Sequence, residues 1–122
     1  MVQLFSVPVS DQDRARDFYV DVLGFELVRD LALGPGQRWV QVRPVGAQTS
    51  ITLVTWFERM PPGSLTGVVL ESDDLEGDVA HLRAHGVVLD AEGIREHPWG
   101  RSAAFADPDG NRLVLQATGP GA

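Results

Sequence analysis

The sequence predicts an α+β fold in which two βαβββ modules follow one another and form a cupped, half-barrel mixed sheet with the helices outside. A strand followed by a capped amphipathic helix occurs twice, and the helices have matching lengths. The segment from Asp11 to Gly24 and the segment from Asp73 to Gly86 each span 13 steps along the chain. A segment rich in proline and glycine, Met60-Pro61-Pro62-Gly63-Ser64, separates the two copies.

The first module begins with a predicted strand over residues 2–9. Ser10 or Asp11 can cap the helix that follows over residues 11–24. The helix repeats apolar residues at helical spacing, namely Ala15, Phe18, Tyr19, Val22 and Leu23. Three further strands are expected at FELVRDL, RWVQVRP and SITLVTW.

The second module repeats this order. A strand over residues 65–71 runs into Ser72-Asp73, and the next helix turns Leu75, Val79 and Leu82 inward before it ends at Gly86. Strands are expected around VVLDAE, RSAAFA and RLVLQ. The residues Asp107-Pro108-Asp109-Gly110-Asn111 favour a hairpin turn, because proline fixes φ and glycine accepts positive φ.

Length and composition indicate one domain over residues 1–122, with module one at about 1–58, a linker at 59–64 and module two at about 65–119. The absence of cysteine excludes disulfides and thiolate metal sites. No signal peptide or membrane span is evident, so a cytoplasmic protein is expected. A net charge of -7 without a basic patch argues against nucleic acid or an anionic membrane as partner.

Three segments carry a family resemblance: SVPVSDQDRARDFYVDVLGFELV, LESDDLEGDVAHLRAHGV and FADPDGNRLVLQ. They resemble the vicinal oxygen chelate superfamily, which includes glyoxalase I, extradiol dioxygenases and bleomycin-binding resistance proteins. The similarity covers nearly the whole chain and is specific for the fold. It is weakly specific for function, because one fold hosts many chemistries.

The metal enzymes of that family place His, Gln or Glu ligands at up to four strand positions. By resemblance, those positions correspond here to Leu4, Thr52, Gly67 (Thr66 if shifted by one) and Val114. Leucine, glycine and valine have no donor atom, and a lone threonine hydroxyl is a poor ligand. The resemblance therefore implies a member that lacks the usual metal ligands, and no metal or other cofactor is expected.

Three tryptophans are candidates for contact with a ligand: Trp39, Trp56 and Trp99. If the strand SITLVTW has the expected register, Trp56 shares one face with Thr52 and Val54. Flat ligands stack well on such side chains, and the indole N–H can fix their orientation. Packing in a core or in a dimer is the alternative for each of them.

Other residues are expected to complete the binding site. The apolar lining would consist of Leu4, Val54, Val69, Phe105 and Val114, with Gly67 and Thr52 at former ligand positions. The polar residues expected on the same faces are Ser6, Gln41, Arg43, Glu71, Arg112 and Gln116. Glu71 could act as a base if buried, but a solvated carboxylate is the simpler interpretation.

The histidines give weaker signals. His81 and His85 are spaced like a metal pair on the second helix, yet the inward face belongs to leucine and valine. A solvent-exposed pair is therefore expected. His97, in the loop HPWGR, is a candidate for contact with a ligand because functional residues favour loops.

These observations predict a non-metal protein that binds and sequesters a small apolar or aromatic molecule, as bleomycin-type antibiotic-resistance proteins do. The alternative is a lyase, isomerase or dioxygenase with atypical metal ligands or with metal-free acid–base catalysis by Glu71 and His97. A third possibility is an interaction domain whose cavity is filled by its own tryptophans. The resemblance also implies a homodimer.

Overall fold

The computed structural model describes residues 2–118 and divides the chain into two compact units. Unit 1 extends to Leu65 and includes the turn Pro108–Asn111. Unit 2 comprises Thr66–Asp107 and the residues from Arg112 onward. The α+β class and the repeated βαβββ order are confirmed. The expected end of module two, near residue 119, lies outside the described residues.

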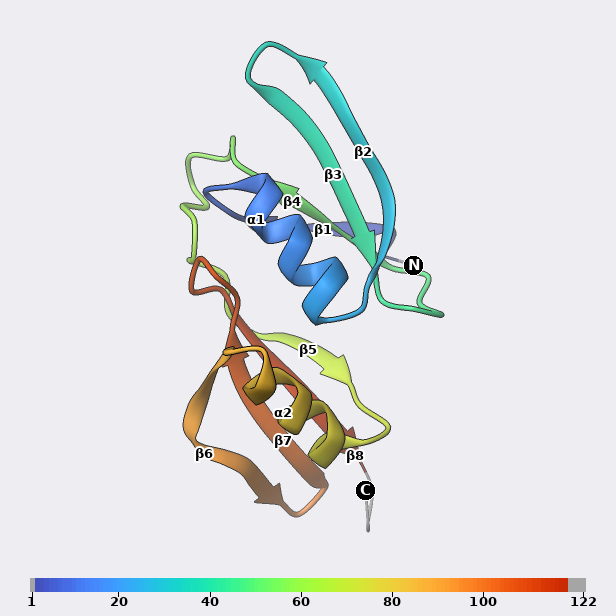
Figure 1. Ribbon diagram of the computed structural model, residues 1–122, viewed down its shortest axis with the longest axis vertical. Helices are drawn as coiled ribbons and strands as arrows, with labels where there is room; N and C mark the ends of the chain where they lie inside the picture. The colour runs from blue at the N-terminus through green and yellow to red at the C-terminus, as the bar shows by residue number, and fades with distance from the viewer. Residues whose placement is uncertain (1, 119–122) are drawn as a thin grey trace. The chain divides into compact units, whose positions relative to one another are not determined.

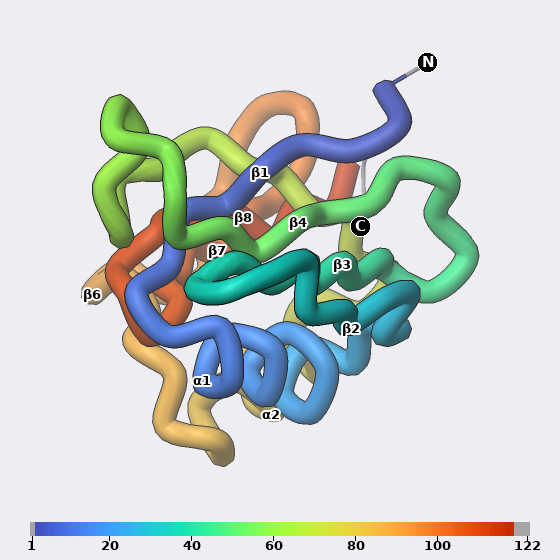
Figure 2. The backbone as a smooth tube through the Cα atoms, turned by 90° about the horizontal axis from the view of Figure 1, so that it is seen from above, coloured from blue at the N-terminus to red at the C-terminus, as the bar shows by residue number. Residues whose placement is uncertain are grey.

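Unit 1 contains a four-stranded sheet with the order β1-β4-β3-β2 (Figures 1 and 2). Strands β1 and β4 are parallel, and the other neighbours are antiparallel. Its elements are β1 (Leu4–Pro8), α1 (Gln12–Asp17), the π-helical turn η1 (Phe18–Val22), β2 (Glu26–Gly34), β3 (Gln37–Arg43) and β4 (Ser50–Val54).

Helix α1 begins where the sequence predicts it, because the Asp11 carboxylate accepts the backbone N–H of Arg14 at 3.1 Å. The helical run is shorter than expected and changes to the π-helical turn at Phe18. One face of the sheet lies against α1, and the residues buried there are Val7, Val40, Val42, Ile51 and Leu53. Burial of this apolar surface stabilises unit 1.

Unit 2 repeats the arrangement with the sheet order β5-β8-β7-β6. Figure 1 shows helix α2 lying along this sheet. The Asp74 carboxylate caps the helix by accepting the Gly77 N–H at 3.1 Å. The elements are β5 (Val68–Glu71), α2 (Leu75–Ala84), β6 (Val88–His97), β7 (Gly100–Ala106) and β8 (Arg112–Thr118).

The core of unit 2 lies between α2 and its sheet. Leu75, Val79 and Leu82 of the helix are buried, as the sequence predicts. Arg101 of β7 forms an ion pair with Glu76 in the first turn of α2, which fixes the helix over the sheet. This ion pair lowers the pKa of the Glu76 carboxyl below its ordinary value.

Two predicted element boundaries are wrong. Strand β4 ends at Val54, so Trp56 lies beyond the strand and does not share its alternation. His97 is the last residue of β6 rather than a loop residue. Both errors concern strand ends, where local sequence preferences are weak and tertiary pairing decides.

The turn Pro108–Asn111 forms its contacts within unit 1. Asn111 is fully buried, donates to the Pro8 carbonyl oxygen at 2.7 Å and accepts the backbone N–H of Leu65 at 3.1 Å. The Asp109 carboxylate accepts hydrogen bonds from the Ser10 hydroxyl and the Ser10 N–H, and it pairs with Arg14 at 3.1 Å. The predicted turn chemistry therefore also supplies tertiary contacts.

Within residues 2–118, the structure contains no helix long and apolar enough to cross a membrane.

Candidate ligand-binding faces

The sheet of unit 1 has a face that points away from α1. Arg38 of β3 donates a hydrogen bond to the Asp13 carboxylate of α1, so its side chain points toward the helix. Val40 and Val42 share this side by alternation, and the residues between them point away from the helix. The register of β1 and β4 extends this second face across the sheet. We call it the Trp39 face; its predicted site residues are Leu4, Ser6, Trp39, Gln41, Arg43, Thr52 and Val54.

A hydrogen bond joins two residues of the Trp39 face along strand β3. The indole Nε1 of Trp39 donates to Oε1 of Gln41 at 3.0 Å, and both side chains are partly buried. The indole ring is therefore held in one orientation above the sheet. The rest of the indole offers a flat apolar surface.

A polar row crosses the Trp39 face beside this pair. Gln41 lies opposite Thr52, and Thr52 lies opposite Ser6 on β1. The Ser6 and Thr52 hydroxyls are hydrogen-bonded to each other at 3.0 Å. Thr52 is buried, and this hydrogen bond gives its hydroxyl a partner within the protein.

The structure adds two residues to the Trp39 face that sequence reasoning missed. On β2, Arg29 lies opposite Gln41 and Leu31 lies opposite Trp39. The register shifts between Leu27 and Arg29, and this irregularity changes which β2 side chains share the face. No local signal marks the shift, although Leu31 itself is 49% exposed.

Arg43, at the far end of β3, is committed to another contact. Its Nη2 lies 3.0 Å from Oε2 of Glu26, and both side chains are substantially exposed. Such a surface ion pair stabilises little. It nevertheless reduces the availability of the Arg43 guanidinium for a ligand.

In unit 2, the corresponding face away from α2 is defined by parallel pairing of β5 and β8. Val69 pairs with Val114, and Glu71 pairs with Gln116. We call this set the Val114 face. Val69 is 53% exposed, and Glu71 is also exposed. Glu71 is therefore a solvated carboxylate rather than a buried base.

Phe105 lies on the opposite side of that sheet. It pairs with the buried Leu113 and is itself fully buried. Alternation therefore separates Phe105 from Val114, whose neighbour on β7 is Ala104. The placement of Phe105 in the core differs from its expected place in the lining, because the β7 register could not be read from the sequence.

His97 and Trp99 form a stack at the turn between β6 and β7. Their ring centroids are 4.4 Å apart and their planes differ by 7°. His97 Nε2 lies 2.7 Å from the buried Ser102 hydroxyl, which anchors the imidazole. Trp99 is 49% exposed and so presents its other face to solvent.

The structure places the remaining predicted residues one by one. Trp56 packs near Phe57, with ring centroids 6.1 Å apart. Gly67 precedes β5 and has a positive φ of 90°. Arg112 shares the Val114 face by alternation along β8, and it forms an ion pair with Asp90. His81 on α2 and His85, the residue that caps its C-terminal end, are exposed as expected, and their ring centroids are 4.3 Å apart.

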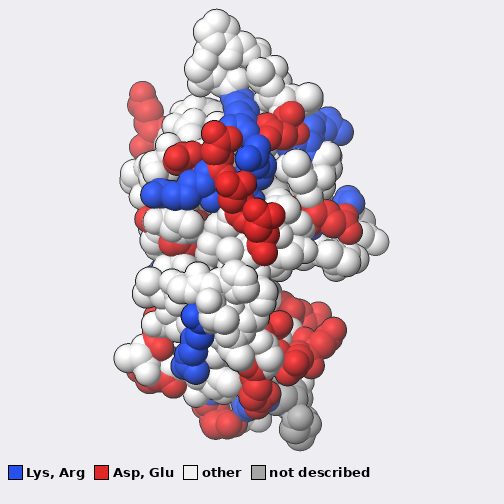
Figure 3. Space-filling model, viewed as in Figure 1, with Lys and Arg blue, Asp and Glu red and all other residues white. Residues whose placement is uncertain are grey.

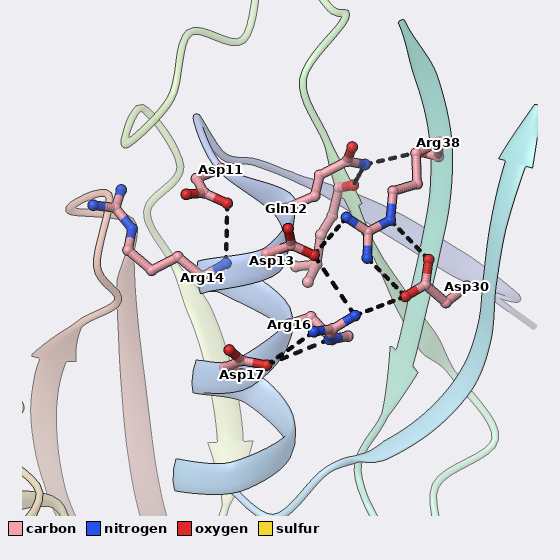
Figure 4. Close-up of polar contacts among 9 residues, drawn as sticks. Asp11, Gln12, Asp13, Arg14, Arg16, Asp17, Asp30 and Arg38 are labelled. Atoms are coloured by element: carbon pink, nitrogen blue, oxygen red, sulfur yellow. Dashed lines mark hydrogen bonds and ion pairs between the residues drawn. The ribbon is translucent and has the colours of Figure 1, made fainter. Parts of the chain in front are cut away.

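A dense charge cluster covers the other side of unit 1, over α1 (Figures 3 and 4). The carboxylate of Asp30 on β2 forms ion pairs with two guanidinium groups. The nitrogen–oxygen distance is 2.8 Å to Arg38 and 3.0 Å to Arg16. Hydrogen bonding from Arg38 first, then from Arg16, lowers the pKa of Asp30 to about 2 even though partial burial opposes this. The cluster joins α1 to the β2–β3 hairpin and lies on the face opposite Trp39.

The residues at the family's metal-ligand positions do not fit a metal ion. Leu4 and Val114 have apolar side chains, Gly67 has none, and the Thr52 hydroxyl is bonded to Ser6. Within the described part of the chain, no three His, Cys, Asp or Glu side chains come together in a group that could hold a metal ion.

Comparison with known proteins adds three findings. Residues 2–115 match the family model described as Glyoxalase/Bleomycin resistance protein/Dioxygenase superfamily. A solved structure of TnmS3, an antibiotic binding protein from Streptomyces sp. CB03234, is 53% identical with a TM-score of 0.91, and the match covers 98% of this chain and 96% of that one. The uncharacterized protein YetH of Bacillus subtilis (strain 168) is 32% identical over 91% of this chain and 92% of its own length.

A different curated protein matches only in part. GTPase Era of Mycobacterium avium (strain 104) is 32% identical over 66% of this chain, but the match covers 28% of that protein. The similarity therefore concerns a portion of that relative.

Proposed function

Because the chain belongs to the Glyoxalase/Bleomycin resistance protein/Dioxygenase superfamily, we propose that it binds and sequesters a small apolar or aromatic molecule without a metal ion. The observation that carries the proposal is the Trp39 face. An oriented indole lies there beside a polar row, on the side of the sheet that α1 leaves uncovered. Ligand sites combine apolar and aromatic surface with a few placed polar groups in this way.

Two further observations support this proposal. The family's ligand positions hold residues that do not fit a metal ion. A structural relative with 53% identity is an antibiotic binding protein. An antibiotic-sequestering role in the cytoplasm is therefore the function that we propose for this chain.

The affinity would come mainly from apolar contact. Burial of apolar surface contributes roughly 25 cal/mol per Å², so a few hundred Å² at Trp39 and Leu31 would support binding at about micromolar concentration after the entropic cost of association. Trp99, stacked on His97, is a separate candidate contact that unit 2 offers by itself. The polar groups would fix the ligand's orientation rather than its strength.

Titration of tryptophan fluorescence with a panel of aromatic antibiotics tests the proposal. Saturable quenching is expected for at least one compound, which mass spectrometry should then recover unchanged. Trp39→Ala should weaken binding at least tenfold, whereas Val45→Ala, at an exposed loop position, should leave it unchanged. Recovery of a chemically altered compound would instead establish the lyase, isomerase or dioxygenase alternative.

We also propose that the protein is a homodimer, as the family resemblance implies. Exposed leucines on the edge strand β2, Leu27, Leu31 and Leu33, support this proposal. Light scattering coupled to size-exclusion chromatography measures the mass directly. A mass near twice 13.2 kDa is expected, and a mass near 13.2 kDa would contradict it.

A further inference from the structure

We infer that the molecule bound at the Trp39 face is planar and presents a hydrogen-bond acceptor oxygen, of the carbonyl or carboxylate type, to Gln41 and Arg29. This inference rests on the proposed function and deepens it by naming the chemical class of the ligand. The polar atoms of this face divide into those already hydrogen-bonded within the protein and those that remain available to a ligand.

The hydrogen bond from Trp39 determines the orientation of the Gln41 amide. An indole N–H can only donate, so the Gln41 atom 3.0 Å away must be the carbonyl oxygen Oε1. The other end of the amide is therefore the NH₂ group, which carries two donors. The end of the Gln41 amide that Trp39 does not contact is therefore a donor rather than an acceptor.

The residue opposite Gln41 is also a donor. Arg29 is its cross-strand partner on β2 and is exposed. A guanidinium has five N–H groups and no acceptor. Arg29 forms no ion pair with any carboxylate in residues 2–118, in contrast to Arg43, which is paired with Glu26. Its donors are therefore directed to solvent or to a ligand.

The side-chain oxygens of Gln41, Ser6 and Thr52 each take part in a hydrogen bond within the protein. Oε1 of Gln41 accepts from Trp39, and the Ser6 and Thr52 hydroxyls are bonded to each other. Among the described residues, the Gln41 NH₂ group and the Arg29 guanidinium are therefore donors of this face that no protein group engages. A ligand whose polar edge carried only donors would leave these groups unpaired on binding, which costs more than the lost hydrogen bonds alone.

The apolar part of the face sets the shape of the ligand. Trp39 and Leu31 lie opposite each other on β3 and β2, and the indole orientation is fixed by its hydrogen bond. A flat ring system can stack on the indole while an oxygen on its edge reaches Gln41 and Arg29.

A pair of matched probes tests this inference. Fluorene and 9-fluorenone share a planar tricyclic skeleton and differ by one carbonyl oxygen. Titration of the full-length protein, followed by tryptophan fluorescence, should give binding of fluorenone at least tenfold tighter than that of fluorene. Equal binding of the two compounds would overturn the inference and leave the proposed function in place.

The variant Gln41→Glu keeps the shape of the side chain and removes its NH₂ donors. The carboxylate still offers an oxygen to Trp39 but no longer has the NH₂ group. Fluorenone binding should weaken at least tenfold while fluorene binding stays within twofold of wild type. Gln48→Glu, at an exposed loop position, adds the same charge elsewhere and should change neither affinity.

Arg29→Met provides a second variant, because it keeps the length of the side chain and removes the donors. Fluorenone binding should weaken and fluorene binding should persist. Unchanged fluorenone binding in both variants would overturn the inference. Failure of wild type to bind either probe would overturn it as well. The proposed function, by contrast, fails if the entire aromatic panel gives no saturable binding or if a bound compound is recovered chemically altered.

Discussion

Asn111 donates its side-chain amide to the carbonyl oxygen of Pro8 at 2.7 Å, across 103 residues of sequence. The same side chain accepts the backbone N–H of Leu65, so one buried amide satisfies two backbone groups. A motif that reads as an ordinary turn therefore holds together three separate segments of unit 1. The Asn111 side chain stabilises tertiary structure, because the turn itself needs no buried amide.

Replacement of this asparagine should destabilise the protein. Asn111→Ala leaves the Pro8 carbonyl and the Leu65 N–H without their buried partner, and we expect a loss of about 2–3 kcal/mol. Urea unfolding followed by circular dichroism measures this loss. Gln48→Ala, at an exposed loop position, serves as the control and should change stability by less than about 0.5 kcal/mol.

Gly63 should tolerate no side chain. It has a φ of 82°, and a Cβ placed there would lie 2.2 Å from the backbone oxygen of Asp109. Gly46 has nearly the same φ, 81°, but open space around it. We expect Gly46→Ala to cost about 1 kcal/mol for its conformation alone and Gly63→Ala to cost at least about 3 kcal/mol. Thermal unfolding of the two variants should reveal the difference, and equal costs would contradict the close approach of Gly63 to Asp109.

The Asp30 cluster should make stability depend on acid pH. The pKa of Asp30 in the folded protein, about 2, lies below the ordinary value near 3.9 in an unfolded chain. The carboxylate therefore stabilises the fold above about pH 4, and this contribution is lost as pH falls toward 2.

Asp30→Asn removes that contribution. At pH 7 the variant should be less stable than wild type by about 1–2 kcal/mol after allowance for solvent screening, and the difference should shrink near pH 2.5. Urea titrations at both pH values measure it. Asp21→Asn, at an exposed position outside the cluster, should show little difference at either pH.

Phe105 and Val69 should respond differently to truncation. Phe105 is fully buried in the core of unit 2, so Phe105→Ala should cost about 3–5 kcal/mol. Val69 is 53% exposed on the Val114 face, so Val69→Ala should cost less than about 1 kcal/mol. Denaturant unfolding measures the two losses of stability. A loss below about 1 kcal/mol for Phe105→Ala would contradict the placement of Phe105 in the core.

The local sequence was sufficient for the order of elements. The Asp11 cap, the inward Leu75, Val79 and Leu82, and the Asp107–Asn111 turn all follow from short-range preferences, and the structure confirms their places. Alternation along β3 likewise places Trp39 and Gln41 on one face. These features depend on residues within a few positions of one another.

The contacts between strands depended on the tertiary structure. The β2–β3 register shift brings Arg29 opposite Gln41, and the β7–β8 register places Phe105 beside Leu113 in the core. Strand register depends on pairing between segments distant in sequence, and a shift by one residue moves every side chain to the other face. The sequence by itself determined which elements form and which residue types the face could offer. Only the tertiary structure decided which of those side chains meet, because hydrogen bonds such as that from Trp39 to Gln41 depend on geometry that residue identity does not specify.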